Sequence, residues 1–169
     1  SEQSKNLVPK RYYGKTVVNL ALGLDDELSK NIESTEGGRD IRALYVGRLL
    51  YWKGIHFALR GFSELLKQNP NARFTILGKG PDAQWIDAAI EWLDWMPRNE
   101  LNAVYQRHHI FLFPSLRDSG GMVVLEAMKN SLPVVCLDIG GPSVIVDETC
   151  GYRIATGGRS EDEVVSELG

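Results

Sequence analysis

The sequence predicts an α/β domain in which helices cover both faces of a parallel sheet. Strand-like and helix-like segments alternate from residue 41 onward. The expected strands at 110–113 (IFLF) and 133–137 (PVVCL) are apolar without alternation, which is typical of strands buried on both faces. Glycines follow several of these strands, and sheets of this kind bind ligands at the carboxyl ends of their strands.

In the first half of the domain, strand 41–46 ends at Gly47, and helix 55–68 shows apolar residues at the 3.6-residue period before Asn69 and Pro70 stop it. Residues 84–96 are ambiguous, and we expect a short helix followed by a short strand. The elements expected up to the middle of the chain are strand 41–46, helix 55–68, strand 73–77, a strand near 90–93 and a helix around 101–105.

In the second half, strand 110–113 ends at Pro114. Pro142 suits a first helical position, and Ser160 with Glu163 forms a capping box that predicts a helix start. The remaining expected elements are strand 110–113, helix 122–129, strand 133–137, a helix from 142, strand 152–154 and a helix from 160. We expect residues 1–40 to form a polar tail, a short strand near 15–22 and an interdomain connector, so that the domain proper is 41–169.

Composition excludes several classes of protein. The 169 residues suit one domain, and 19 Lys and Arg against 22 Asp and Glu give a net charge of −3, which argues against a nucleic-acid binder. Two cysteines are too few for a disulfide framework. No apolar run reaches the roughly 20 residues of a membrane span, and the polar start predicts no signal peptide, so we expect a cytoplasmic protein. A start without Met predicts a processed chain or an excised fragment.

Two groups of residues have the chemistry of an anion site. Arg48 and Lys53 lie between the end of a strand and the start of a helix, where cations and free N–H groups favour a diphosphate. A solvated loop with two charges explains the pair equally well. Gly120 and Gly121 precede helix 122–129 and offer N–H groups to a phosphate, while Glu126 interrupts an apolar stretch of that helix. The alternative is a solvent-facing stripe made of Glu126, Lys129 and Asn130.

Other motifs carry weaker predictions. Residues 78–83 (GKGPDA) fit a dinucleotide fingerprint, but it is misplaced within the unit, so a tight turn is the better interpretation. The three histidines show no metal-ligand spacing, and no metal site is expected. Cys136 is expected to be an inert core thiol. Trp85, Trp92 and Trp95 recur at irregular spacing, so we expect them to be packing residues and not an aromatic ligand cage.

Together these segments resemble, from about 42 to 154, the C-terminal donor-binding domain of GT-B glycosyltransferases of family 4, also called group 1. Their shared order and spacing carry the resemblance. The matching residues are Tyr45-Val46-Gly47-Arg48-Leu49, Lys53-Gly54, Ile76-Leu77-Gly78-Lys79-Gly80-Pro81, Glu100-Leu101 with Tyr105, Phe113-Pro114-Ser115, Leu125-Glu126-Ala127-Met128, Pro133-Val134-Val135 and Gly140-Gly141.

The resemblance implies a three-layer Rossmann-like sheet, the C-terminal half of a GT-B fold. It also implies an E-x7-E pair of catalytic acids, in which Asp118 takes the place of the first Glu and Glu126 is the second, on the donor ribose. The other implied roles are donor sugar for Asp118 and Ser119, diphosphate for Arg48, Lys53, Gly120 and Gly121, and nucleobase for Gly78, Met96 and Arg98.

The implied reaction is sugar transfer, with retention, from a nucleoside-diphosphate sugar to an acceptor in glycan, polysaccharide or glycolipid synthesis. No metal and no other cofactor is implied. The acceptor would be bound by an N-terminal domain that is absent from this sequence, so we expect the fragment to be inactive alone. The full-length enzyme could associate peripherally with a membrane.

Four alternatives stay open. A sugar-nucleotide epimerase or a sugar phosphorylase would share the fold, although no motif for a pyridoxal phosphate lysine is present. A non-catalytic nucleotide-sugar binding module would share the site. A nicotinamide dehydrogenase would depend only on Gly78 and Gly80.

Overall fold

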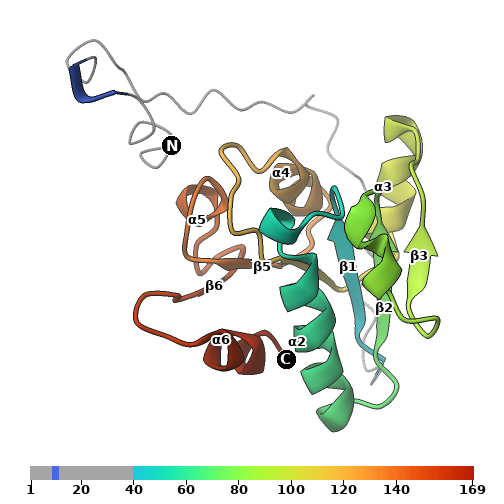
Figure 1. The fold of residues 1–169 in the computed structure, drawn as a ribbon. Coiled ribbons are helices and arrows are strands. Elements are labelled where there is room, and N and C mark those ends of the chain that lie inside the picture. The colour runs from blue at the N-terminus through green and yellow to red at the C-terminus, as the bar shows by residue number, and fades with distance from the viewer. Residues whose placement is uncertain (1–8, 12–39) are drawn as a thin grey trace.

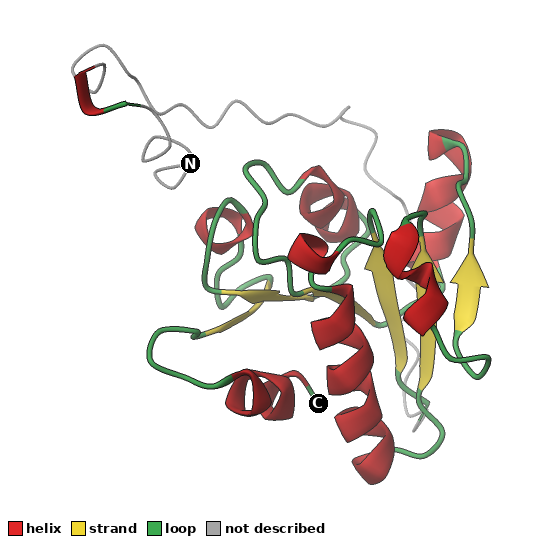
Figure 2. Ribbon diagram, in the orientation of Figure 1, coloured by secondary structure: helices red, strands yellow, loops and turns green. Residues whose placement is uncertain are grey.

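The computed structural model describes residues 9–11 and 40–169. The short strand expected near 15–22 and most of the expected tail and connector therefore lie outside the described residues. Residues 40–169 form an α/β domain, in which helices cover both faces of a parallel sheet (Figures 1 and 2). The strands are β1 (Arg42–Val46), β2 (Arg73–Leu77), β3 (Glu91–Leu93), β4 (Ile110–Phe113), β5 (Val134–Leu137) and β6 (Gly151–Ile154). The helices are η2 (Tyr51–Lys53), α2 (Ile55–Gln68), η3 (Pro81–Trp85), α3 (Arg98–Gln106), α4 (Met122–Lys129), α5 (Pro142–Ile145) and α6 (Glu161–Leu168).

The six strands are all parallel and follow the order β3-β2-β1-β4-β5-β6. Within the sheet, the path starts at the centre with β1, moves outward through β2 to β3, and then crosses back to β4 on the other side of β1. Ala43 pairs with Ile110 and Leu44 with Phe111. The strand order therefore reverses between β1 and β4, and the loops after these two strands leave the sheet in different directions. Open α/β sheets bind ligands at such a reversal point.

Alternate side chains of β1 enter two different core layers. Ala43 and Tyr45 pack with residues of α2, such as Ile55, on one face. Leu44 and Val46 pack on the other face, together with residues of α3 and α4. The prediction of helices on both faces is therefore confirmed, and it follows from strands with no polar side. In a third cluster Val164, Val165 and Leu168 of α6 pack with Phe57, Leu137 and Ile154.

The predicted elements agree with the structure to within a few residues. The predicted bounds of helices 55–68 and 122–129 and of strands 73–77 and 110–113 are those observed. The ambiguous stretch contains η3, which starts at Pro81 because proline suits a first helical position, and the short edge strand β3. Among the described residues no helix is long and apolar enough to cross a membrane.

Candidate functional site

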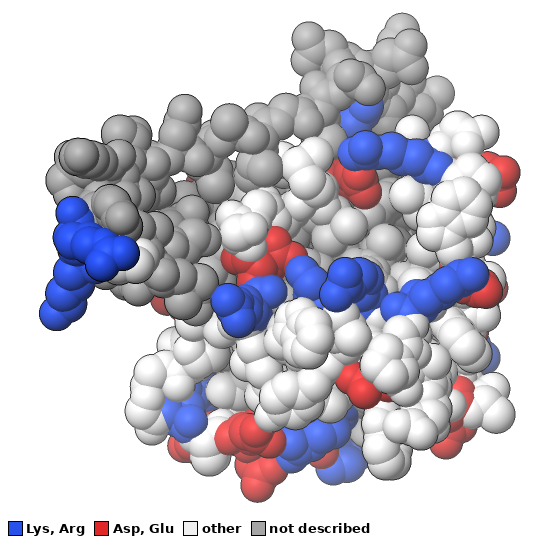
Figure 3. All heavy atoms as spheres, turned by 45° about the horizontal axis from the view of Figure 1, so that its top comes forward, with Lys and Arg blue, Asp and Glu red and all other residues white. Residues whose placement is uncertain are grey.

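The loops that follow β1, β2, β4 and β5 meet at the carboxyl edge of the sheet. Gly47 N donates to Leu77 O at 3.0 Å, which joins the first two loops, and Gly141 N donates to Asp118 O at 2.8 Å, which joins the last two. Figure 3 views this end of the molecule and shows a row of Lys and Arg side chains across its face. The edge is therefore the place where cations gather beside the start of α4.

Tyr45 fixes the loop that carries the two predicted cations. Its side chain is fully buried, and its hydroxyl donates to the carbonyl oxygens of Arg48 and Lys53 at 3.1 and 3.2 Å. Burial, then the nearby Asp118 and Asp82 carboxylates, raise the pKa of this hydroxyl far above its ordinary value, so it remains a donor. Sequence reasoning assigned Tyr45 no such role; the one signal was a polar aromatic in an otherwise aliphatic strand.

Gly54 brings the loop after β1 against the loop after β4. Its φ is +72°, and a Cβ on this residue would lie 1.8 Å from the carbonyl oxygen of Pro114. The carbonyl oxygen of Trp52 then accepts hydrogen bonds from Leu116 N at 3.0 Å and Arg117 N at 3.1 Å. Only glycine permits this approach, and the approach carries Lys53 to Asp118.

Lys53 and Asp118 form an ion pair at the centre of the edge. Lys53 Nζ lies 2.5 Å from Asp118 Oδ2, and the two side chains are 22% and 14% exposed. Asp118 Oδ1 accepts from Gly121 N at 2.7 Å and Gly120 N at 3.0 Å. Burial by itself raises the pKa of Asp118, but the hydrogen bonds from Lys53 and the two glycines outweigh it and hold that pKa below its ordinary value. The two glycine N–H groups, expected to be free, are thus occupied by a carboxylate.

Glu126 projects from α4 toward the start of α3. Its Oε1 lies 2.5 Å from Arg98 Nη2, and its Oε2 accepts from the Tyr105 hydroxyl at 3.2 Å. Tyr105 is 1% exposed, and burial, then the Glu126 carboxylate, raise its pKa, so its hydroxyl stays protonated. The alternative of a solvent-facing stripe is wrong, because Asn130 is 1% exposed and donates to Glu126 O at 2.9 Å.

The three residues expected near a nucleobase lie after β2, after β3 and at the start of α3. Arg98 contacts Glu126, whereas Met96 packs against the core. Gly78 lies against the loop after β1, since a Cβ here would be 1.8 Å from Gly47 O. Ser119, expected near the sugar, is exposed beside Asp118.

The tryptophan prediction is wrong. Trp85, Trp92 and Trp95 are 68%, 49% and 71% exposed. They belong to η3, to β3 at the edge of the sheet and to the loop after it. Trp92 Nε1 donates to Gly78 O at 2.9 Å, so this side chain lies over the loop after β2. By contrast, Cys136 is a fully buried thiol, as predicted for a core residue, and burial raises its pKa to about 12.

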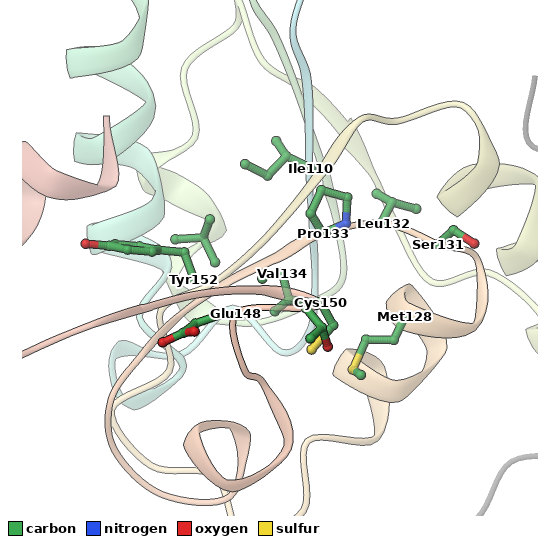
Figure 4. A pocket seen from close by; sticks show the side chains of 12 residues that line it. Ile110, Met128, Ser131, Leu132, Pro133, Val134, Glu148, Cys150 and Tyr152 are labelled. Carbon is green, nitrogen blue, oxygen red and sulfur yellow. The ribbon is translucent and has the colours of Figure 1, made fainter. Parts of the chain in front are cut away.

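The opposite, amino edge of the sheet contains a separate cavity of about 590 Å³. Figure 4 shows Met128 and Cys150 beside each other in its lining and Tyr152 further along β6. No sequence motif pointed to it, and none of the predicted site residues lines it. Among the residues the structure describes, no three His, Cys, Asp or Glu side chains are grouped as a metal site.

Curated relatives of this chain include proteins named as glycosyltransferases and as glycogen synthases. The chain is 36% identical over 119 residues to D-inositol 3-phosphate glycosyltransferase of Corynebacterium efficiens, which covers 62% of this chain and 28% of that protein. It is 35% identical over 107 residues to glycogen synthase of Mycobacterium tuberculosis (strain H37Rv), covering 58% of this chain and 26% of that protein. The chain thus spans under a third of the length of these relatives.

Solved structures share the fold. The pneumococcal O-GlcNAc transferase GtfA, solved with UDP and GlcNAc, matches with a TM-score of 0.77 at 21% identity, covering 99% of this chain and 35% of that one. The C-terminal domain of the group 1 glycosyl transferase LpcC from Francisella tularensis matches with a TM-score of 0.62 at 22% identity, covering 76% and 73%. The family model described as "Glycosyl transferases group 1" matches residues 40–168, which is most of the chain. The chain therefore belongs to the group 1 glycosyltransferase family, with the Rossmann-like architecture of a GT-B domain.

Proposed function

We propose that this chain binds the nucleoside-diphosphate-sugar donor of a retaining glycosyltransferase that builds a glycan, polysaccharide or glycolipid. One observation carries the proposal: a single edge of the sheet brings together Arg48, Lys53, the start of α4 and Glu126. Tyr45 holds the backbone carbonyl groups of Arg48 and Lys53, and the Lys53 side chain reaches Asp118 in the loop after β4.

The diphosphate is assigned to the centre of this edge. Two cations and the N–H groups of Gly120 and Gly121 at the start of α4 suit an anion with several acceptor oxygens. During transfer the leaving nucleoside diphosphate gains negative charge, which Arg48 and Lys53 stabilise. These cations supply the role that a divalent metal would otherwise have, so the proposed reaction uses no metal.

The ribose is assigned to Glu126. A carboxylate has two acceptor oxygens with about four lone pairs, so Glu126 accepts from two ribose hydroxyls while Tyr105 continues to orient one oxygen. Arg98 is 71% exposed, so it is able to move from Glu126 toward the nucleobase, which is assigned to the region of Gly78, Met96 and Arg98.

The donor sugar is assigned to Asp118 and Ser119, and the acceptor to the rest of the protein. The named relatives are more than three times as long as the stretch they share with this chain. We propose that a further domain outside residues 1–169 binds the acceptor, and that residues 1–169 by themselves transfer no sugar. We also propose a cytoplasmic location, where a chain with two unpaired cysteines would stay reduced.

Calorimetric titration with UDP, GDP, ADP and NAD, with and without magnesium, tests the proposal. We expect one nucleoside diphosphate to bind equally well in both conditions. Lys53→Ala removes a charge-assisted contact of about 1.5–3 kcal/mol, which weakens that binding roughly 10- to 150-fold. Lys67→Ala is the matched control, because it removes the same charge from the far end of α2.

Unchanged affinity in Lys53→Ala would contradict the proposed diphosphate site, and tight binding of NAD would favour a dehydrogenase. With the full-length protein and a labelled donor, transfer gives free nucleoside diphosphate, whereas an epimerase that interconverts two sugar nucleotides leaves the nucleotide attached to the sugar. Analysis of the products therefore distinguishes a glycosyltransferase from an epimerase of the same fold.

A further inference from the structure

The carboxylate of Asp118 already holds the hydrogen-bond donors that the proposed function assigns to the diphosphate. It lies 2.5 Å from Lys53 Nζ, 2.7 Å from Gly121 N and 3.0 Å from Gly120 N. Three donors therefore converge on one anionic group at the start of α4. A carboxylate and a phosphate are similar in charge and in the spacing of their oxygens, so the contacts made by one are suited to the other.

We propose that Asp118 is an internal competitor of the donor diphosphate: its carboxylate must leave the two glycine N–H groups before a phosphate oxygen takes them. Each backbone N–H has one hydrogen to donate, so both anions cannot hold the same pair of groups. Lys53 has three hydrogens and is able to contact both, but two adjacent anions repel each other at this distance. Binding of the diphosphate is therefore coupled to movement of the Asp118 side chain.

The length of the side chain explains why aspartate suits this role. The bonds from Gly120 and Gly121 close a local turn in which a side-chain oxygen accepts from N–H groups two and three residues further along the chain. Aspartate and asparagine make this turn readily, whereas glutamate has an additional methylene group. Asp118→Glu is thus expected to weaken the competition while it keeps the charge.

The competition has a consequence for donor recognition. Asp118 is 14% exposed, and it lies next to the exposed Ser119, on the side of the loop assigned to the sugar. When the diphosphate displaces the carboxylate, the freed carboxylate becomes an acceptor for a sugar hydroxyl. When the complete donor binds, the contact between the freed carboxylate and the sugar hydroxyl offsets part of the free energy lost in displacing the carboxylate. The nucleoside diphosphate product has no sugar and makes no such contact, so Asp118 favours release of the product.

The inference rests on the proposed function, and affinity measurements test it. Asp118→Ala and Asp118→Asn are titrated with the nucleoside diphosphate that the wild type binds best and with the nucleoside without phosphates. We expect the diphosphate to bind about tenfold tighter to Asp118→Ala, since removal of a competing state raises the fraction of protein able to bind. Affinity for the nucleoside is expected to stay unchanged. Glu148→Gln, which removes one negative charge at the amino edge, is expected to leave both affinities unchanged.

Equal or weaker binding of the diphosphate to both Asp118 variants would overturn the inference. A crystal structure of the wild type with the diphosphate separates displacement from simple loss of charge. We expect the Asp118 carboxylate to lie beyond hydrogen-bond distance of Gly120 N and Gly121 N, and a carboxylate still bound to both would also overturn it. If the wild type binds no nucleoside diphosphate at all, the proposed function itself fails; a wild type that binds while the variants show no gain refutes only the competition.

Discussion

Replacement of Tyr105 by Phe removes one hydroxyl and leaves the ring in place. That hydroxyl donates to Glu126 Oε2 at 3.2 Å, and the ring packs edge-on against Phe111 with centroids 5.8 Å apart. A buried hydrogen bond to a charged group contributes about 1.5–3 kcal/mol. The contact is long for an O–H donor, and Arg98 still holds the other oxygen of Glu126, so we expect the free energy of unfolding to fall by about 1–1.5 kcal/mol.

Urea denaturation measures this loss, and Tyr152→Phe is the matched control. Tyr152 also donates to a glutamate, Glu167, but it is 56% exposed, so its replacement is expected to cost under about 0.5 kcal/mol. If Glu126 binds the ribose, Tyr105→Phe also reduces the preference for a ribonucleotide over its 2′-deoxy analogue, whereas Tyr152→Phe does not. A Tyr105→Phe protein with unchanged stability and unchanged ribose preference would refute the idea that Tyr105 positions Glu126.

Three further outcomes are expected. Gly54→Ala should lower the free energy of unfolding by several kcal/mol more than Gly158→Ala. Both glycines have positive φ, but only a Cβ at position 54 would lie 1.8 Å from a backbone oxygen. Equal losses of unfolding free energy in urea denaturation would contradict this. Mass spectrometry after alkylation of the native protein at pH 8 should find Cys136 unmodified, since its pKa is raised to about 12, and partly exposed Cys150 as the more labelled thiol. Folding lowers the pKa of Asp118, so the ionised carboxylate should contribute its full stabilisation at pH values above its ordinary pKa of 3.8. This stabilisation should vanish as the pH falls through the lower pKa of the folded protein. A difference in stability between wild type and Asp118→Asn that persists at still lower pH would oppose this assignment.

The sequence by itself determined the elements and the family. The apolar run 110–113 ends at Pro114, and a run without a polar side has to be covered on both faces. Local signals of this kind depend on neighbours within a few residues, which is why helix 55–68 and strand 73–77 were predicted with the bounds observed. The edge strand β3 was ambiguous because three residues contain too little periodicity to distinguish a strand from a turn.

The tertiary structure decided which groups face one another. Lys53 and Asp118 are 65 positions apart, and Tyr105 and Glu126 are 21 apart. Both contacts depend on helices and loops that the sheet brings together, and in particular on β1 lying beside β4. Periodicity records which side of an element is apolar, but it does not record the order of strands in the sheet. For that reason the sequence could propose which residue types form the candidate site, whereas the contact of Asp118 with the glycine N–H groups became visible only in the folded chain.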